Sequence, residues 1–273
     1  MKPHVDKQIG PYKLQSFVRP GRVGDVYQAT ARDGSTVWVK VVHDEFFSEK
    51  QAIARFEREA QLLSDIDDPS MLNILKWGRS DNAAWLAIEA VEGPTLKDAL
   101  APGPLHINDV RKLAMGLAKA LASAHSRRMI IRDVVPENIL LVNSDPQNLK
   151  LLDLGFTRLV GMPVVSDLKT SHDTRIGDPT YMAPEYIEDS GLDHRADLYS
   201  MGIVLYQALT GKAPFTGKPF EIMLAQVSDR PIAPVALRPD TPPALQHLIL
   251  SLLEKEPKRR PQNAKQVMAL LGG

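Results

Sequence analysis

Residues 130–141 read IIRDVVPENILL, and this stretch decides how the rest of the chain is interpreted. Two apolar runs flank a short polar loop that presents Asp133 and, shortly after it, Asn138. A carboxylate can accept a proton from an attacking hydroxyl group, and a carboxamide oxygen on the same loop can hold a magnesium ion. A second apolar run, residues 151–155 (LLDLG), leads to another carboxylate, Asp153, before a glycine.

These two segments resemble the catalytic loop and the metal-binding loop of protein kinases, most of all those of bacterial serine/threonine kinases. The resemblance covers nearly the whole chain, and its motifs follow one another in the family's order. It implies that Asp133 is the catalytic base and that Asn138 and Asp153 bind Mg²⁺. It also implies a protein as partner or substrate.

The implied fold is of the α+β class, a bilobal protein kinase fold. It has a small, β-rich N-lobe with one C-helix and a larger, mainly helical C-lobe. We expect a leader at residues 1–10, the N-lobe at 11–92 and the C-lobe at 93–273, with one kinase-like domain spanning 11–271. The 273 residues are enough for a core of that size.

The composition of the chain narrows its partners. It has 33 basic and 33 acidic residues, so its charge gives no bulk attraction to nucleic acid or to an anionic membrane. It has no cysteine, which excludes disulfides and cysteine-based metal sites. No apolar run reaches membrane-spanning length, and no signal-peptide pattern opens the chain. We therefore expect no nucleic-acid partner, no membrane contact within this chain and a cytoplasmic location.

Short runs of β-branched and aromatic residues at 12–18, 23–29 and 36–42 predict three strands. In kinases the hairpin between the first two is glycine-rich, because glycine lets the backbone approach the nucleotide phosphates. Gly21 and Gly24 match two of the family's three glycines, and Val26 follows them. Arg19 takes the place of the first glycine. Two glycines are a weak signal, and a plain β-turn is the alternative.

Residues 37–40 (VWVK) end the third strand with Lys40, which in the family binds the α- and β-phosphates. A helical pattern over 46–65 supplies Glu59 as the glutamate that pairs with this lysine. The alternative is that Lys40 lies on an edge strand and points into solvent. Trp38 faces the same side of the strand as Lys40, where the family has a small alanine above the adenine. We expect the indole to narrow or block the adenine site, unless it turns to the back of the sheet.

Two more strands, predicted at 72–75 and 84–90, lead into a segment that resembles the kinase hinge. There the resemblance assigns adenine contacts to the backbone of Glu89 and Val91, and it adds Leu140 to the nucleotide-binding residues. If the adenine site is open, we expect ATP and Mg²⁺ as cofactors. If the site is blocked, we expect no cofactor.

Apolar residues at helical spacing predict helices at 95–100 and 108–127, the second capped by Asn108. The catalytic loop that follows departs from the family twice. Ile131 replaces a histidine that helps orient the metal loop, and Val135 replaces a lysine that contacts the γ-phosphate. Loss of one donor aimed at transition-state charge costs about 10²- to 10³-fold in rate, or roughly 3–4 kcal/mol.

Residues 153–185 resemble an activation segment that Arg132 would contact once the segment is phosphorylated. Its candidate phosphorylation sites are Thr170, Ser171 and Thr174, with unmodified polar loop residues as the alternative. Asp178 replaces a threonine that bonds the catalytic aspartate. The loss of a cation at Val135 and the gain of an anion at Asp178 both make binding of a highly negatively charged reactant less favourable.

Three further residues resemble structural positions of the family. Asp197 would hold the backbone of the catalytic loop, and Arg260 would pair with Glu185. They support the fold and do not bear on activity.

Two functions remain open, and a third is weaker. The first is a pseudokinase or strongly impaired kinase that acts as a regulatory or scaffolding module, and it rests on the five departures. The second is an active serine/threonine kinase that uses MgATP, with Arg19 or Arg22 supplying the missing cation. A small-molecule phosphotransferase is disfavoured by the full activation segment. The five departures are Arg19, Trp38, Ile131, Val135 and Asp178.

Overall fold

The computed structural model describes residues 4–21, 24–43, 56–57, 60–61, 64, 66, 68–80, 83–152, 158–159 and 178–272. The chain divides into two compact units, residues 1–92 and 93–273.

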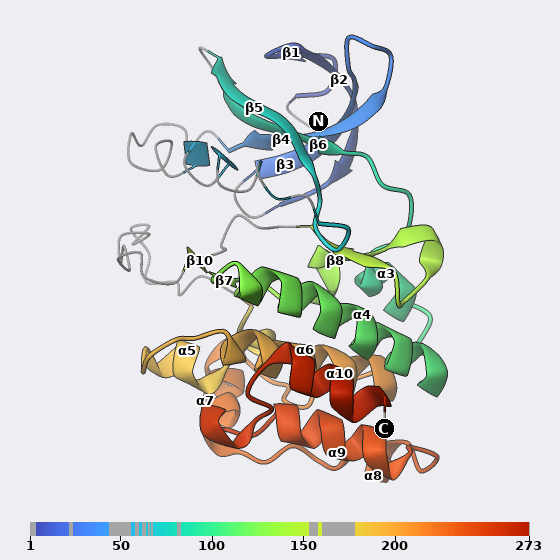
Figure 1. Cartoon of the computed structure of the whole chain (residues 1–273), viewed down its shortest axis with the longest axis vertical. Helices are drawn as coiled ribbons and strands as arrows, with labels where there is room; N and C mark the ends of the chain where they lie inside the picture. Colours follow the sequence, from blue (N-terminus) through green and yellow to red (C-terminus); the bar gives the residue numbers. More distant parts are fainter. Residues whose placement is uncertain are drawn as a thin grey trace. The chain divides into compact units, whose positions relative to one another are not determined.

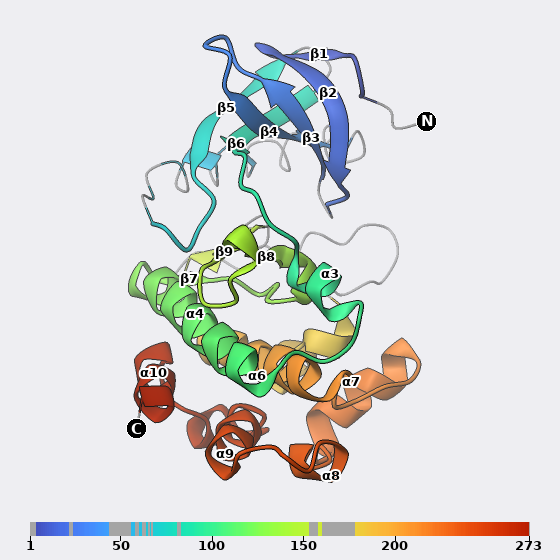
Figure 2. The ribbon, with the colours of Figure 1, turned by 90° about the vertical axis from the view of Figure 1, so that its right-hand side faces the viewer.

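The first unit is built on a six-stranded antiparallel sheet in the order β1-β2-β3-β4-β6-β5. Figure 1 and Figure 2 show this sheet as a curved layer. Its strands are β1 (Gln8–Ile9), β2 (Tyr12–Arg19), β3 (Gly24–Thr30), β4 (Thr36–Val42), β5 (Ile74–Ser80) and β6 (Ala83–Glu89). The pairing of β1 with β2 extends the sheet into the segment that the sequence suggested as a leader.

Alternation along β4 decides which face of the sheet holds the core. Val37, Val39 and Val41 are at most 2% exposed and belong to one apolar cluster with Tyr27 and Trp85. The side chains between them, Trp38 and Lys40, therefore point to the opposite face.

Trp85 packs where two glycines leave room for its ring. An added Cβ at Gly10 would lie 2.5 Å from Cε2 of Trp85, and one at Gly78 would lie 2.7 Å from Cζ2. Gly10 also has a φ of +55°, which disfavours any other residue. The edge of Tyr12 completes the contact, with ring centroids 5.4 Å apart.

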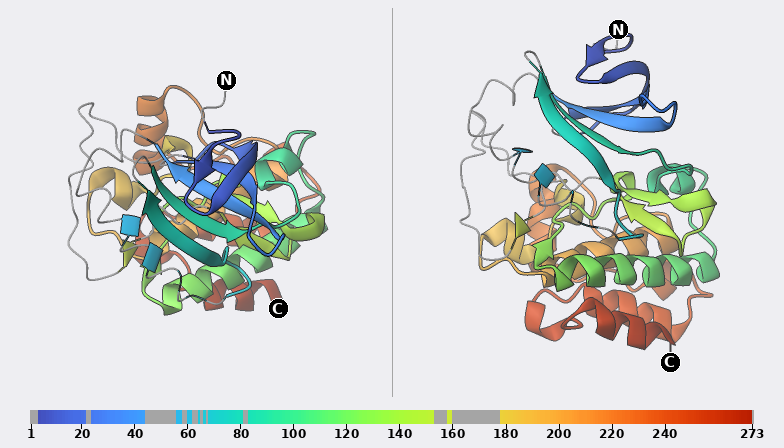
Figure 3. Two further views of the ribbon diagram at one scale, coloured as in Figure 1. Left: turned by 90° about the horizontal axis from the view of Figure 1, so that it is seen from above. Right: turned by 45° about the horizontal axis from the view of Figure 1, so that its top comes forward.

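The second unit is mainly helical, as Figure 1 and both views of Figure 3 show. Its α-helices are α3 (Leu96–Leu100), α4 (Ile107–Ser126), α5 (Pro184–Glu188), α6 (Arg195–Thr210), α7 (Pro219–Ser228), α8 (Pro234–Leu237), α9 (Pro243–Leu252) and α10 (Ala264–Gly272). Short strands and single turns of 3-10 helix lie in the segments that connect these helices. These are β7 (Met129–Ile130), η1 (Pro136–Asn138), β8 (Ile139–Leu141), η2 (Val142–Ser144), β9 (Leu149–Leu151), β10 (Arg158–Leu159), η3 (Pro179–Tyr181) and η4 (Pro257–Arg259).

Helix α6 is the centre of this unit. Thirteen of its sixteen residues are buried, as expected for a helix that is apolar on every side. It packs against α4 and α9, and α10 lies along α4. None of the described helices combines the length and the apolar character needed to cross a bilayer.

Two element boundaries differ from the sequence expectation. The strand expected at 72–75 corresponds to β5. The polar residues of β5 also pair with β6, so the strand continues to Ser80, past the apolar run on which the prediction was based. The helix expected to be capped by Asn108 begins one residue earlier, after His106, and no side chain caps its first turn.

Candidate active site

The backbone of the catalytic loop is held by one buried carboxylate. Asp197, on α6, is fully buried, and its Oδ2 accepts a hydrogen bond from the amide of Ile131 at 2.9 Å. Its Oδ1 accepts from the amide of Arg132 at 2.8 Å. Arg132 has a φ of +65°, a conformation that needs such support. The role expected of Asp197 is therefore present in the structure.

The sequence analysis did not single out the residue that supports Asp197 in turn. His125, at the end of α4, lies 2.8 Å from Oδ2 of Asp197 through its Nε2 atom, and its side chain is only 9% exposed. In the sequence, His125 is a single histidine at the end of an otherwise apolar helix face. Such a residue shows no partner until the fold brings α4 and α6 together.

Asp133 and Asn138 meet on this loop. The Nδ2 atom of Asn138 donates to Oδ2 of Asp133 at 2.7 Å, and each residue is 8% exposed. An ionised carboxylate only accepts hydrogen bonds, so the amide presents its nitrogen to Asp133 and keeps its oxygen for another partner. Magnesium prefers such oxygen ligands, so the orientation of Asn138 fits a metal.

The other expected metal ligand, Asp153, lies outside the described residues. Within the part of the chain that the structure describes, no group of three or more His, Asp or Glu side chains is arranged to hold a metal ion. A magnesium site at Asn138 would therefore depend on Asp153 and on phosphate oxygens, as is usual for this ion.

The two apolar replacements in the loop are both buried. Ile131 is 1% exposed, and Val135 is 7% exposed. The amide of Val135 donates to the carbonyl of Asp133 at 3.0 Å, which turns the chain into η1. Where the family's lysine would extend toward a phosphate, this loop has a packed isopropyl group.

Asp178 begins η3, and its Oδ1 accepts a hydrogen bond from the amide of Thr180 at 2.9 Å. The carboxylate is exposed. Its charge acts on two neighbours. A hydrogen bond to Glu137 raises the pKa of Lys97, and the charge of Asp178 adds to that rise. Burial raises the pKa of Tyr181, and the carboxylates of Glu137 and Asp178 add to it. This end of the loop is therefore acidic.

The pair expected from the late arginine motif is present and buried. Arg260 donates to both carboxylate oxygens of Glu185 at 2.7 Å, and the two side chains are 0% and 4% exposed. Further hydrogen bonds from the guanidinium reach the carbonyls of Arg195, Glu254 and Lys255. This cluster ties the start of α5 to the turn before α10.

The first unit carries the other expected nucleotide-binding residues. Lys40 pairs across the sheet with Val26 on β3 and Leu86 on β6, and it is 9% exposed. Trp38 pairs with Gln28 and Ile88 in the same register and is partly buried. The Cβ of Trp38 thus points to the face of Lys40, and Trp38 is not a member of the described apolar cluster on the opposite face.

The two glycines sit where a side chain would not fit. An added Cβ at Gly24 would collide with the carbonyl of Val41, and one at Gly21 would collide with the carbonyl of Gly24. The Cβ position of Gly21 also lies 3.7 Å from Cε of Lys40, so this end of the hairpin approaches the lysine. Arg19, in place of the first glycine, ends β2 opposite Val26.

The expected hinge residues follow β6. Glu89 accepts a hydrogen bond from the amide of Asn73 through Oε1 at 2.8 Å, and its own amide donates to the carbonyl of Asn73 at 3.1 Å. These bonds tie the end of β6 to the residue that precedes β5. Val91 lies just after it, and Leu140, 2% exposed, lies on β8 of the second unit.

Several expected residues fall outside the described part of the chain. They are Arg22, Glu59, Asp153, Thr170, Ser171 and Thr174.

Comparisons with known proteins bear on the family and the fold of this chain. Residues 12–270 match the family description of the protein kinase domain. The serine/threonine-protein kinase pkn3 of Myxococcus xanthus is 32% identical, and the match covers 98% of this chain and 52% of that protein. The serine/threonine-protein kinase pkn2 of the same organism is 34% identical over 94% of this chain and 32% of that protein. The chain thus spans about a third to a half of the length of these relatives.

A solved structure confirms the bilobal fold. The crystal structure of a point mutant of the PknI kinase domain of Mycobacterium tuberculosis superposes with a TM-score of 0.74 and covers 100% of both chains. The identity is 22%, so this likeness bears on the fold alone.

Proposed function

The chain belongs to the protein kinase family, and on that premise we propose that it is a pseudokinase or strongly impaired serine/threonine kinase that acts as a regulatory or scaffolding module. The observation that carries the proposal is the buried Val135, 7% exposed and two residues after Asp133. Its side chain offers no charge to a transferring phosphoryl group. In such reactions the protein contributes mainly positioning and electrostatic stabilisation, so a missing cation weakens the main source of catalysis.

The position of Trp38 supports the same proposal. Its position on β4 faces the same side as Lys40, and by resemblance it corresponds to the position at which the family has a small residue above the adenine. Protein interiors are close-packed, so an indole at this position leaves less room for the nucleotide base than the methyl group of an alanine would. The acidic end of the loop at Asp178 and Glu137 adds repulsion toward a polyphosphate.

The alternative is an active serine/threonine kinase, and one observation favours it. Asn138 keeps its amide oxygen available because its nitrogen is bonded to Asp133. In this reading Asn138 and Asp153 would hold Mg²⁺, and Asp133 would accept the proton of the substrate hydroxyl. Lys40, paired with Glu59, would hold the ATP phosphates under the hairpin of Gly21 and Gly24. The expected base-binding residues are Val26, Trp38, Glu89, Val91 and Leu140.

The relatives bear the names of serine/threonine kinases, and under either reading we propose a protein as partner or substrate. A cytoplasmic location and a bacterial source belong to the same proposal. The bacterial relatives support the bacterial source, and a sequence without cysteine is compatible with a reducing compartment.

Nucleotide binding with and without Mg²⁺ is the experiment that separates these functions. Titration calorimetry should find no saturable binding of ATP, and a transfer assay with radiolabelled ATP should find no product above that of Asp133→Ala. Micromolar binding together with transfer that Asp133→Ala abolishes would establish the active kinase and refute the pseudokinase. Binding without transfer would leave an impaired kinase, with an open adenine site.

A further inference from the structure

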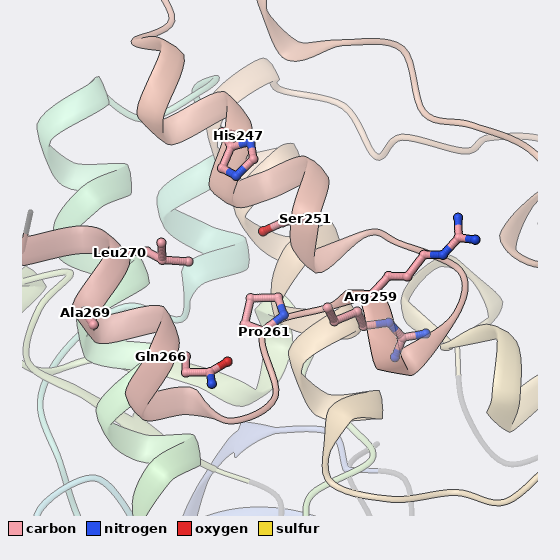
Figure 4. Close-up of a pocket in the computed structure, with 8 residues that line it drawn as sticks. His247, Ser251, Arg259, Pro261, Gln266, Ala269 and Leu270 are labelled. Atoms are coloured by element: carbon pink, nitrogen blue, oxygen red, sulfur yellow. The ribbon is translucent and has the colours of Figure 1, made fainter.

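A hollow on the second unit is lined by none of the residues proposed to bind nucleotide or metal or to act in catalysis, although Arg260, the partner of Glu185, belongs to its lining. It has a volume of about 420 Å³ and is formed by α9, the turn that follows η4, and α10. Figure 4 shows His247 and Ser251 on one helix facing Gln266, Ala269 and Leu270 on the other.

Three of the residues that line the hollow, Pro261, Ala269 and Leu270, are apolar. Pro261 forms part of the lining and is buried, whereas Ala269 is exposed. Leu270 is 49% exposed, which leaves half of a large apolar side chain open to water beside the hollow. An apolar side chain placed here would be removed from water together with Leu270.

The wall also carries a directed polar group. Oε1 of Gln266 accepts a hydrogen bond from the amide of Gln262 at 2.6 Å. This bond fixes the amide plane and turns Nε2, a donor, away from Gln262. A ligand with an acceptor next to its apolar part would match this wall.

The rim has a surplus of positive charge. None of the described residues that line the hollow is acidic, whereas two of them are arginines. The charge of Arg260 is already balanced by Glu185. Glu256, however, is shared between Lys258 at 2.8 Å and Arg259 at 3.1 Å, so one carboxylate faces two cations. Arg259 is 62% exposed and can turn toward an added anion.

We propose that this hollow is a docking site for a protein partner, which it binds through an acidic peptide segment with a large apolar side chain. The apolar side chain enters beside Leu270 and Pro261, and a neighbouring carboxylate pairs with Arg259. Complementary charge supplies specificity and speeds association more than it adds affinity. The proposal does not depend on nucleotide binding, so it stands or falls separately from the proposed function.

Fluorescence anisotropy with labelled peptides tests the proposal on the full chain. The probe is Gly-Ser-Phe-Glu-Glu-Ser, compared with a form that has lysine for both glutamates and with one that has alanine for phenylalanine. We expect saturable micromolar binding of the first peptide and binding at least about tenfold weaker for the other two. Leu270→Glu and Arg259→Glu should each weaken binding of the first peptide by about tenfold.

Leu237→Glu is the matched control, because Leu237 on α8 is 48% exposed against 49% for Leu270. It should leave the affinity unchanged. Equal thermal unfolding of the Leu237 and Leu270 variants would show that both fold. The proposal is overturned by an absence of saturable binding, by equal binding of the lysine peptide, or by unchanged affinity in Leu270→Glu.

Discussion

Asn138 donates a hydrogen bond from its side-chain amide to the carboxylate of Asp133 at 2.7 Å, within one turn of the catalytic loop. This bond orients the proposed base without neutralising it, because the amide carries no charge. In the family a lysine at the position of Val135 would add a cation beside the same carboxylate. Under the proposed function, the loop keeps its shape through this bond and lacks the cation that would stabilise the transferring phosphoryl group.

The first prediction restores that cation. In a Trp38→Ala background, which opens the adenine site, Val135→Lys should raise phosphoryl transfer to a generic protein substrate by about 10²-fold. Initial rates with radiolabelled ATP measure this. Val135→Met in the same background is the control, because it adds length without charge. Equal rates for the lysine and methionine variants would show that charge at this position is not what limits transfer.

The second prediction concerns the indole on the face of Lys40. ATP with Mg²⁺ should not shift the thermal unfolding of the unaltered protein. It should raise the unfolding temperature of Trp38→Ala, since a ligand at 100 times its Kd adds about 2.7 kcal/mol. For a chain of this size each kcal/mol corresponds to about 2–4 °C. Trp77→Ala, on β5, is the control and should behave like the unaltered protein. A shift in the unaltered protein would show that Trp38 does not block the site.

The fold could be predicted because the motifs of this sequence resemble those of protein kinases in residue type and in order. The pairing of Arg260 with Glu185 and the anchoring of the loop by Asp197 were expected and occur. The bond from His125 to Asp197 was not, because it joins residues 72 positions apart that no local pattern connects. The direction of the Asp178 side chain could not be predicted from the sequence either. It caps η3 locally, and only the folded loop shows that its charge falls near Lys97 and Tyr181.

The third prediction tests the buried ion pair. Arg260→Met should reduce the free energy of unfolding by about 3–5 kcal/mol, because it leaves the carboxylate of Glu185 buried without its partner. Urea unfolding followed by circular dichroism measures the loss. Arg259→Met is the control, since that side chain is 62% exposed and should change stability by less than about 0.5 kcal/mol. Equal losses in the two variants would contradict the structural role of the pair.

The fourth prediction concerns His125. His125→Phe keeps the ring volume but removes the group that bonds Asp197, and it should destabilise the protein by about 1–3 kcal/mol. Because Asp197 also holds the amides of Ile131 and Arg132, hydrogen exchange at these two amides should become faster. His247→Phe, at an exposed site, should change neither quantity. A loss of stability with unchanged exchange at the two amides would show that His125 does not act through Asp197.

The surroundings of Lys255 give the protein a titratable group with an altered pKa. Its Nζ atom donates to the hydroxyl of Tyr199 at 3.0 Å and to the carbonyls of Ala225 and Gln226 at 3.1 and 2.7 Å. The pKa of Lys255 is lowered to about 8, chiefly by burial; Asp229 opposes this shift, and the charge of Arg260 contributes to it.

The fifth prediction is the pH dependence that follows from this lowered pKa. Above about pH 8 the folded protein releases the proton of Lys255, while the unfolded chain keeps it up to about 10.4. The unfolded state then binds more protons, so the free energy of unfolding should rise with pH in this window. Tyrosines begin to titrate near 10, so the comparison ends at about pH 9.5. Urea unfolding should therefore show the unaltered protein gaining stability relative to Lys255→Met between about pH 8 and 9.5. Exposed Lys212, changed to methionine, should give a difference that does not vary with pH. A flat difference for Lys255→Met would mean that the ammonium stays charged in the fold, held by its three acceptors.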